Sequence, residues 1–343
     1  MTSFSPSLDA LGWSSRWAAL LGEIPQPGAV PARVIHRDRG FATVSTGDDA
    51  LTFPLSDRFG QLVTGDWVAI GAGGIAGMLP RKGALRRRGP DGVEQVLAAN
   101  LDVVLLVCGI DRPVKAGRIQ RGAIQAWDAG ASPTVILNKA DLGPTAELRS
   151  GIELESPGLD VIEVSTLTGV GLDLVRAAIG GRTVVLLGES GAGKSSLMNA
   201  LAGESLAGIA AVRAGDAKGR HTTTRRELHV VPGTGIVIDT PGTREFGLAA
   251  DQSSIDAAFA DVEEIALGCR FYDCRHATEP GCAVRAAIDS GVLPAKRLES
   301  FNRLQREVDS EVLRANPHHR RRNERRFAKV VKQAVKIKRG EEP

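Results

Sequence analysis

The segment Gly188–Ser195 has the residue types and spacing of a phosphate-binding loop. It follows the β-branched run Thr183–Leu187 and precedes a helical stretch, a context that disfavours a chance glycine-rich turn. Glycines let the backbone wrap so that successive N–H groups point at phosphate oxygens, and a helix N-terminus adds a favourable field. Lys194 is expected to reach the β- and γ-phosphates, and the Ser195 hydroxyl to ligate Mg²⁺. The expected nucleotide contacts along the loop are Gly188, Glu189, Ser190, Gly191, Ala192, Gly193, Lys194, Ser195 and Ser196.

A second short motif, Asp239-Thr-Pro-Gly242, follows the apolar run Gly235–Ile238. An acid at such a strand end can hold Mg²⁺ through water, and the Gly242 N–H can bond the γ-phosphate. Alone, the tetrapeptide is also an ordinary turn sequence.

A third motif, Asn138-Lys139-Ala140-Asp141, follows the run Thr134–Leu137. The Asp141 carboxylate can accept two parallel hydrogen bonds from guanine, whereas adenine would leave it buried and unpaired. Asn138 can brace the phosphate loop, and the stem of Lys139 can cover the face of the base. Ser165, after the run Val161–Val164, is placed to contact guanine O6 through nearby backbone groups. These residues predict a GTP site and disfavour an ATPase.

The first switch of such a site is expected in Lys218–Thr224, between the phosphate loop and Asp239. A threonine hydroxyl here would complete Mg²⁺ coordination, and Thr223 and Thr224 are both candidates. His221 either orients the attacking water or is an exposed loop histidine. Thr243 occupies the place where Ras-like enzymes carry a water-orienting Gln, so unaided hydrolysis should be slow.

The order of these motifs is permuted, because base recognition precedes phosphate binding, which precedes the Mg²⁺ aspartate. Loops that meet at one sheet edge can form the same site in either order, since only the positions of the strands in space matter. The segment after Asp239 then leads directly into a cysteine-containing region.

That region carries the spacing Cys269-x₄-Cys274-x-His276-x₅-Cys282. Three thiolates and one imidazole suit a closed tetrahedral site for one structural Zn²⁺. The alternative is four incidental core residues, because the spacing is not among the commonest zinc-finger spacings. The fourth cysteine, Cys108, lies in an apolar run and is expected to act as a small hydrophobe.

Short β-branched runs alternate with helical stretches from about residue 101, which predicts a parallel sheet covered by helices on both sides. Before it, four short strands within residues 30–80 predict a small β-barrel, of the oligonucleotide-binding (OB) or the SH3-like kind. After residue 247 the expected helices are Ser253–Leu267 and Pro294–Leu313.

The arginine-, glycine- and proline-rich stretch Pro80–Gly92 resembles a linker, in which Arg86–Arg88 are either solvated or in contact with phosphate. The net charge of +3 is unevenly distributed: residues 314–339 hold eleven Lys or Arg against one acid, Glu324. This basic tail suits a polyanionic partner or is a solvated helix end.

The bulk composition, 43% hydrophobic over 343 residues, is that of a multidomain globular protein. No apolar run approaches the roughly 20 residues needed to span a bilayer, so no membrane partner is expected. The first ten residues lack the pattern of a secretory signal, and we expect a cytoplasmic protein.

Taken together, the motifs resemble the ribosome small subunit-dependent GTPases of the RsgA family. The resemblance covers roughly residues 30–310 and includes Gln95–Asp102, Glu279–Val284 and the run Asp-Thr-Pro-Gly-x-Arg-Glu-Phe that starts at Asp239. It implies an N-terminal OB barrel, a circularly permuted G domain and a C-terminal zinc domain. Thr243 departs from the hydrophobic residue expected there, which affects how water would be positioned.

The family also implies GTP hydrolysis to GDP, stimulated by the 30S subunit during late assembly and accompanied by 16S rRNA binding. The domains are expected at 30–80 (barrel), 81–96 (linker), 97–250 (G domain) and 251–313 (zinc domain), with an extension over 1–29 and the tail over 314–343. A monomer is expected. The competing hypothesis is an RNA-binding chaperone or scaffold with a vestigial nucleotide site.

Overall fold

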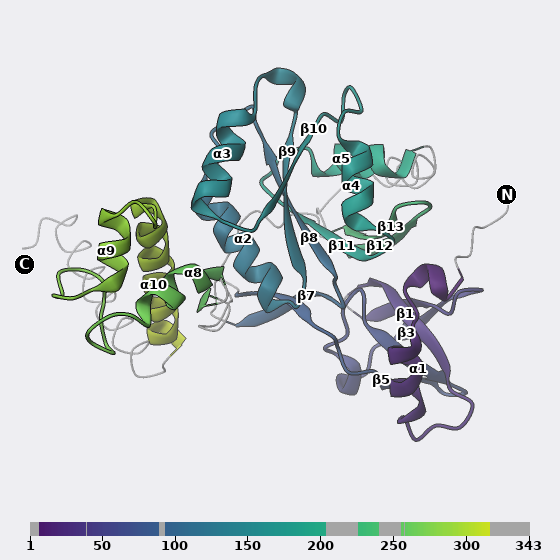
Figure 1. Cartoon of the computed structure of the whole chain (residues 1–343). Helices are drawn as coiled ribbons and strands as arrows, with labels where there is room; N and C mark the ends of the chain where they lie inside the picture. The colour runs from purple at the N-terminus through teal and green to yellow at the C-terminus, as the bar shows by residue number, and fades with distance from the viewer. Residues whose placement is uncertain are drawn as a thin grey trace, which may run out of the picture.

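The computed structural model describes residues 7–38, 40–88, 93–203, 226–239, 255–256 and 258–315. Figure 1 shows an N-terminal β unit in purple, a central sheet flanked by helices, and a C-terminal helical lobe in green to yellow. The expected first switch (His221, Thr223, Thr224), Gly242, Thr243 and the basic tail beyond residue 315 lie outside the described residues. No helix of the described part is long and apolar enough to cross a membrane.

The central sheet runs parallel through the five strands that the β-branched runs predict. In spatial order these are β10 (Asp160–Val164), β9 (Ser132–Asn138), β8 (Val103–Gly109), β11 (Thr183–Leu187) and β13 (Gly235–Asp239). β12 (Arg226–Val231) then adds antiparallel to β13. Because the five strands are parallel, their carboxyl ends lie along one edge, and predicted site residues end or follow four of them, β9, β10, β11 and β13.

Helices cover both faces of this sheet, as the alternation predicts (Figure 1). One side carries α2 (Ala116–Asp128) and α3 (Ala146–Glu155), with the short 3₁₀ helix η3 (Ala140–Leu142) before α3. The other carries α4 (Leu172–Ile179) and α5 (Lys194–Ala202). The alternate residues of β8 divide between the two cores: Val104 and Leu106 face one, and Val103 and Leu105 the other.

The N-terminal unit holds five antiparallel strands in the order β3-β2-β1-β4-β5. They are β1 (Val30–Arg37), β2 (Phe41–Ser45), β3 (Ala50–Pro54), β4 (Trp67–Gly71) and β5 (Gly74–Met78), with the 3₁₀ helix η2 (Asp57–Phe59) between β3 and β4. Side chains from all five contribute to one small core. No ladder joins β3 to β5 within the described residues, so closure into an OB barrel stays a prediction. β1 also pairs with β12, which extends the central sheet into this unit.

The expected N-terminal extension is packed rather than free. The 3₁₀ helix η1 (Asp9–Leu11) and α1 (Ser15–Gly22) bring two tryptophans onto the β unit. Trp13 and Trp17 lie 4.8 and 6.0 Å from the Trp67 ring, measured between centroids. Beside them the buried Arg33 donates to the carbonyl oxygens of Leu11, Gly65 and Asn100 and to Thr183 Oγ1. Burial lowers the pKa of Arg33 to about 10.

Two strands occupy much of the described part of the stretch expected to be a linker. β6 (Ala84–Arg88) and β7 (Glu94–Ala99) form an antiparallel hairpin. Leu85 and Leu97 are buried in the core under α2, while Arg86 pairs with Glu94 and Asp128 on the polar side. The arginine-rich composition hid the buried residues, which are consecutive within each strand and do not alternate with polar ones.

The C-terminal lobe contains α8 (Ala260–Ala266), α9 (Ala283–Asp289) and α10 (Ala295–Ala315). The described part of the first expected helix, Ser253–Leu267, thus contains α8, and α10 confirms the second. The apolar stripe of α10 packs inward against Phe259, and Phe301 meets that ring at 5.5 Å. Arg297 crosses the interface: it pairs with Asp261 at 2.7 Å and donates to the Glu155 carbonyl of α3 at 3.1 Å.

Candidate nucleotide and metal sites

The carboxyl edge of the parallel sheet brings the predicted base-reading and phosphate-binding residues together. Asn138 ends β9, Ser165 follows β10, the phosphate loop follows β11 and Asp239 ends β13. Ligands of open α/β sheets bind at this edge. The permuted order of the motifs therefore leaves the spatial arrangement of a nucleotide site intact.

Asn138 braces the phosphate loop, as its position predicts. Its side chain is fully buried, and Nδ2 donates to the Ala192 carbonyl oxygen at 3.0 Å. A Cβ atom on Gly193, whose φ is +92°, would lie 2.2 Å from that Nδ2, so the loop requires glycine there. Asn138 Oδ1 is buried and has no hydrogen-bond partner among the described residues.

Asp141 is held by Ser165, a contact that sequence reasoning did not foresee. The Ser165 hydroxyl donates to Asp141 Oδ1 at 2.5 Å and accepts from the Thr168 N–H at 3.1 Å. The expected role of Ser165 was a contact to guanine O6 through its backbone surroundings. The structure adds a second role, because the hydroxyl fixes the carboxylate that would receive the guanine donors.

The phosphate loop is folded around its own lysine. Lys194 Nζ donates to the carbonyl oxygens of Gly188 at 2.6 Å and Glu189 at 2.8 Å. Burial lowers the pKa of Lys194, and the charge of Asp239 partly opposes this shift. Asp239 and Lys194 are thus electrostatic neighbours, as expected for groups that would share a Mg²⁺-bound triphosphate. These two carbonyl oxygens engage two of the three N–H donors of the ammonium group.

The segment after β8 supplies three charged residues that the sequence analysis missed. Asp111 accepts from Lys139 Nζ at 2.8 Å, Arg112 donates to the Ser190 carbonyl at 3.0 Å, and Arg118 pairs with Glu189. The pKa of Asp111 is lowered, first by the hydrogen bond from Lys139. Their position in the fold could have indicated these residues, because β8 ends at the same sheet edge as the strands that carry the recognised motifs.

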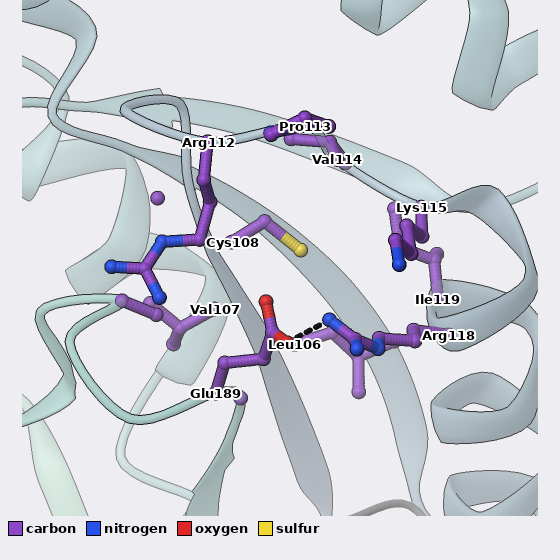
Figure 2. Close-up of a pocket in the computed structure, with 13 residues that line it drawn as sticks. Leu106, Val107, Cys108, Arg112, Pro113, Val114, Lys115, Arg118, Ile119 and Glu189 are labelled. Atoms are coloured by element: carbon purple, nitrogen blue, oxygen red, sulfur yellow. Dashed lines mark hydrogen bonds and ion pairs between the residues drawn. The ribbon is translucent and has the colours of Figure 1, made fainter.

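Figure 2 shows the small pocket beside the phosphate loop, with the Arg118–Glu189 pair in it and Arg112 at its side. Cys108 also lines it. Burial raises the pKa of the Cys108 thiol to about 11, so at neutral pH the group behaves as a small hydrophobe. This agrees with the expectation for Cys108.

The metal-binding candidates Cys269, Cys274, His276 and Cys282 form one cluster, whose four ligand atoms lie within 4.8 Å of one another. Cys269 Sγ is 3.9 Å from Cys282 Sγ and 3.6 Å from His276 Nδ1, and His276 Nδ1 is 3.4 Å from Cys282 Sγ. Tetrahedral Zn²⁺ with bonds of about 2.0–2.3 Å places its ligand atoms about 3.5–3.8 Å apart. The residues present therefore fit such an ion.

Local structure holds the cluster in this shape. Cys282 caps α9, where its sulfur accepts from the Arg285 N–H at 3.5 Å, and His276 adopts a left-handed backbone with φ of 59°. The Glu279 carboxylate accepts from the N–H groups of Arg275, Ala277 and Thr278. The loop that carries the imidazole is thus ordered by its own hydrogen bonds.

Known proteins are similar to this chain in sequence and in fold. The RsgA GTPase family matches residues 78–249. The small ribosomal subunit biogenesis GTPase RsgA of Streptomyces coelicolor is 42% identical over 97% of this chain and 96% of its own length. The chain belongs to the RsgA GTPase family.

Two solved structures are similar to this RsgA-family chain. YjeQ from Thermotoga maritima superposes with a TM-score of 0.60, 25% identity, and coverage of 82% of this chain and 98% of that one. YloQ, a circularly permuted GTPase, gives a TM-score of 0.58 over 83% of this chain and 97% of that one, at 21% identity, and supports the fold alone. The permuted GTPase fold is thereby confirmed.

Membership in the RsgA family makes the chain a GTP hydrolase. This outcome disfavours the competing hypothesis of a vestigial site, and Lys194, Ser195 and Asp239 are all present. The individual contributions of these residues to GTP and Mg²⁺ binding remain predictions.

Proposed function

We propose that this RsgA GTPase hydrolyses GTP on the small (30S) ribosomal subunit during late subunit biogenesis, in the cytoplasm, and that it acts as a monomer. The observation that carries the proposal is the meeting of the Asp141–Ser165 pair, the Asn138 brace and the Lys194 loop at one sheet edge. The relatives named as small ribosomal subunit biogenesis GTPases supply the ribosomal partner.

Within this function each predicted residue keeps its proposed role. Asp141 would recognise guanine, the stem of Lys139 would cover the face of the base, and Ala140 would lie beside them in the GTP site. Asn138 would brace the phosphate loop. Gly188–Ser196 and Gly242 would bind the phosphates. Ser195 and Asp239 would hold Mg²⁺, which supplies charge neutralisation at the phosphates when bound.

The Cys269–Cys282 cluster would hold one structural Zn²⁺ and stabilise the C-terminal lobe. The N-terminal β unit, proposed as an OB barrel over 30–80, and the basic tail over 314–343 would contact 16S rRNA through phosphates. The remaining proposed boundaries place the G domain at 97–250 and the zinc domain at 251–313.

The test is GTP turnover with and without purified 30S subunits at low salt. We expect slow turnover alone and a large increase with subunits, because Thr243 replaces the water-orienting glutamine of Ras-like enzymes. Turnover that subunits leave unchanged would remove the ribosome from the proposal. A Lys194→Ala variant serves as the control for contaminating GTPases, since it should remain inactive in both conditions.

A further inference from the structure

Three arginines from separate elements converge where the N-terminal β unit joins the central sheet. Arg37 ends β1, Arg226 begins β12 and Arg87 lies in the hairpin strand β6. The β1–β12 ladder places Arg37 directly opposite Arg226. Among the described strands, this is the only ladder between the two regions. All three side chains are half-buried.

This register places two like charges, those of Arg37 and Arg226, opposite each other. Directly opposed residues of antiparallel strands have Cβ atoms about 5 Å apart, and like charges there are destabilising. Burial lowers the pKa of Arg226, and the charges of Arg87 and Arg37 lower it further. Each guanidinium group is therefore within electrostatic reach of another.

The side-chain hydrogen bonds of this cluster within the described residues all go to neutral groups. Arg37 Nη2 donates to the Gly60 carbonyl at 2.7 Å, and Arg87 donates to Gln95 Oε1 at 3.3 and 3.2 Å. No ion pair links these three arginines to a carboxylate of the residues that the structure describes. The buried Nε atoms of Arg37 and Arg226 have no hydrogen-bond partner in that part of the chain. Two buried donors and three positive charges thus remain for an anion.

We propose that Arg37, Arg87 and Arg226 bind a phosphodiester group of the RNA backbone. The guanidinium fork matches phosphate oxygens, and one phosphate would satisfy the Nε–H donors and relieve the repulsion. RNA is the polyanion we assign because the inference rests on the proposed ribosomal function. In the Arg86–Arg88 run, Arg86 is engaged with acids, whereas Arg87 has only the neutral Gln95 as a side-chain partner among the described residues.

The site adjoins the nucleotide edge. In the β12–β13 ladder Glu227, the neighbour of Arg226, lies opposite Asp239. Arg226 also follows Thr224, a candidate Mg²⁺ ligand, by two residues in the chain. A bound phosphate would clamp β1 to β12 next to the strand end that carries Asp239, and so connect RNA contact with the GTP site.

The experiment measures binding of a fluorescent 20-nucleotide single-stranded RNA to the full chain, with GDP filling the phosphate loop. The test variant is Arg37→Gln/Arg226→Gln, and the matched control is Arg149→Gln/Arg176→Gln, which removes two charges from α3 and α4. Each lost phosphate contact lowers the slope of log K against log salt by about 0.7, which is roughly a fivefold loss of affinity at 0.1 M salt. We expect a five- to twenty-five-fold loss (roughly one to two contacts) for the test variant and a smaller change for the control.

Equal slopes and affinities for the test and control variants would overturn the site. A 30S-stimulated GTPase assay on the natural chain separates this outcome from failure of the proposed function. Stimulation together with equal slopes removes the site alone, whereas absent stimulation with a reduced slope removes the ribosomal function alone. Arg226→Lys guards against misfolding: it keeps the charge but loses the fork, and we expect an intermediate affinity.

Discussion

The four metal-binding candidates come from fourteen consecutive residues, Cys269–Cys282, whereas the nucleotide site draws on strand ends spread from Gly109 to Asp239. The local cluster already has ligand spacings that suit Zn²⁺. The dispersed site is shaped unevenly: its base-reading side is fixed by Ser165 and Asn138, and its phosphate side is closed on Lys194.

This contrast shows which part of the structure positions the residues of each site. A short loop can pre-arrange ligands through its own caps and turns, as the Glu279 carboxylate does around His276. A site assembled from distant strand ends takes its geometry from the sheet. Its lysines contact nearby groups of the protein: Lys139 contacts Asp111, and Lys194 contacts carbonyl oxygens of its own loop. The two sites should therefore fail independently, since changes at separated positions add within about 0.3–0.5 kcal/mol.

The largest expected effect is loss of the metal. Cys282→Ser should abolish stoichiometric zinc and unfold the C-terminal lobe, because zinc binding contributes about 10–16 kcal/mol in finger peptides. Metal analysis and thiol titration provide the measurement. In the zinc-loaded chain Cys108 should react slowly, because its pKa is about 11, and a chelator should release three further thiols. Full zinc content in the variant would contradict the site, and a large loss of GDP affinity would break the independence of the two sites.

The next largest effect is expected from a substitution on the phosphate side of the nucleotide site. Lys194→Ala should lower GTP turnover about 10²–10³-fold, the range seen on removing one preorganised donor to transition-state charge. Steady-state phosphate release measures the effect, and zinc content should stay unchanged. Lys115→Ala is the matched control, because Lys115 lines the adjacent pocket without belonging to the loop. Equal losses in the two variants would argue against a specific role for Lys194.

A base-side change should alter specificity more than chemistry. Asp141→Asn should weaken GTP binding about 10²-fold and favour xanthosine triphosphate, since hydrogen bonds to a charged group contribute about 1.5–3 kcal/mol each. Competition binding measures the preference. Asp160→Asn, at the opposite end of β10, is the control. An unchanged preference would remove Asp141 from base recognition.

The smallest expected effect comes from the group that supports Asp141. Ser165→Ala should weaken GDP and GTP equally, by about fivefold, because one hydrogen bond contributes about 1 kcal/mol. Calorimetric titration with each nucleotide tests this. A loss of affinity for GTP but not for GDP would mean that Ser165 acts on the phosphate side. The division of the site into a base side and a phosphate side would then be wrong.

Sequence reasoning succeeded where chemistry is local. The runs Val103–Val107 and Thr183–Leu187 predict buried strands because β-branched residues without alternation suit a doubly covered sheet. The motifs after them predict the nucleotide edge, and the cysteine spacing predicts the metal cluster. Each of these signals lies within a few residues of the structure it specifies.

Prediction failed where partners are distant in the chain. The strands Ala84–Arg88 and Glu94–Ala99 form a hairpin, one face of which is buried under α2. The sequence of the hairpin alone does not indicate this burial. The pairing of Arg37 with Arg226, and of Lys139 with Asp111, depends on registers and loop ends that the sequence does not specify. The contact of Lys194 with its own loop differs, because its partners lie only five and six residues away, and there the motif alone does not reveal the contact.

That intraloop contact sets up a competition for the ammonium group of Lys194. The carbonyl oxygens of Gly188 and Glu189 and the phosphates of an incoming nucleotide would compete for this group, so we expect molecules with Lys194 released to capture nucleotide faster. The capture rate should then level off at high GTP concentration, at a ceiling set by loop opening. Product release would involve the reverse step: as GDP leaves, Lys194 would again donate to the two carbonyl oxygens of the loop.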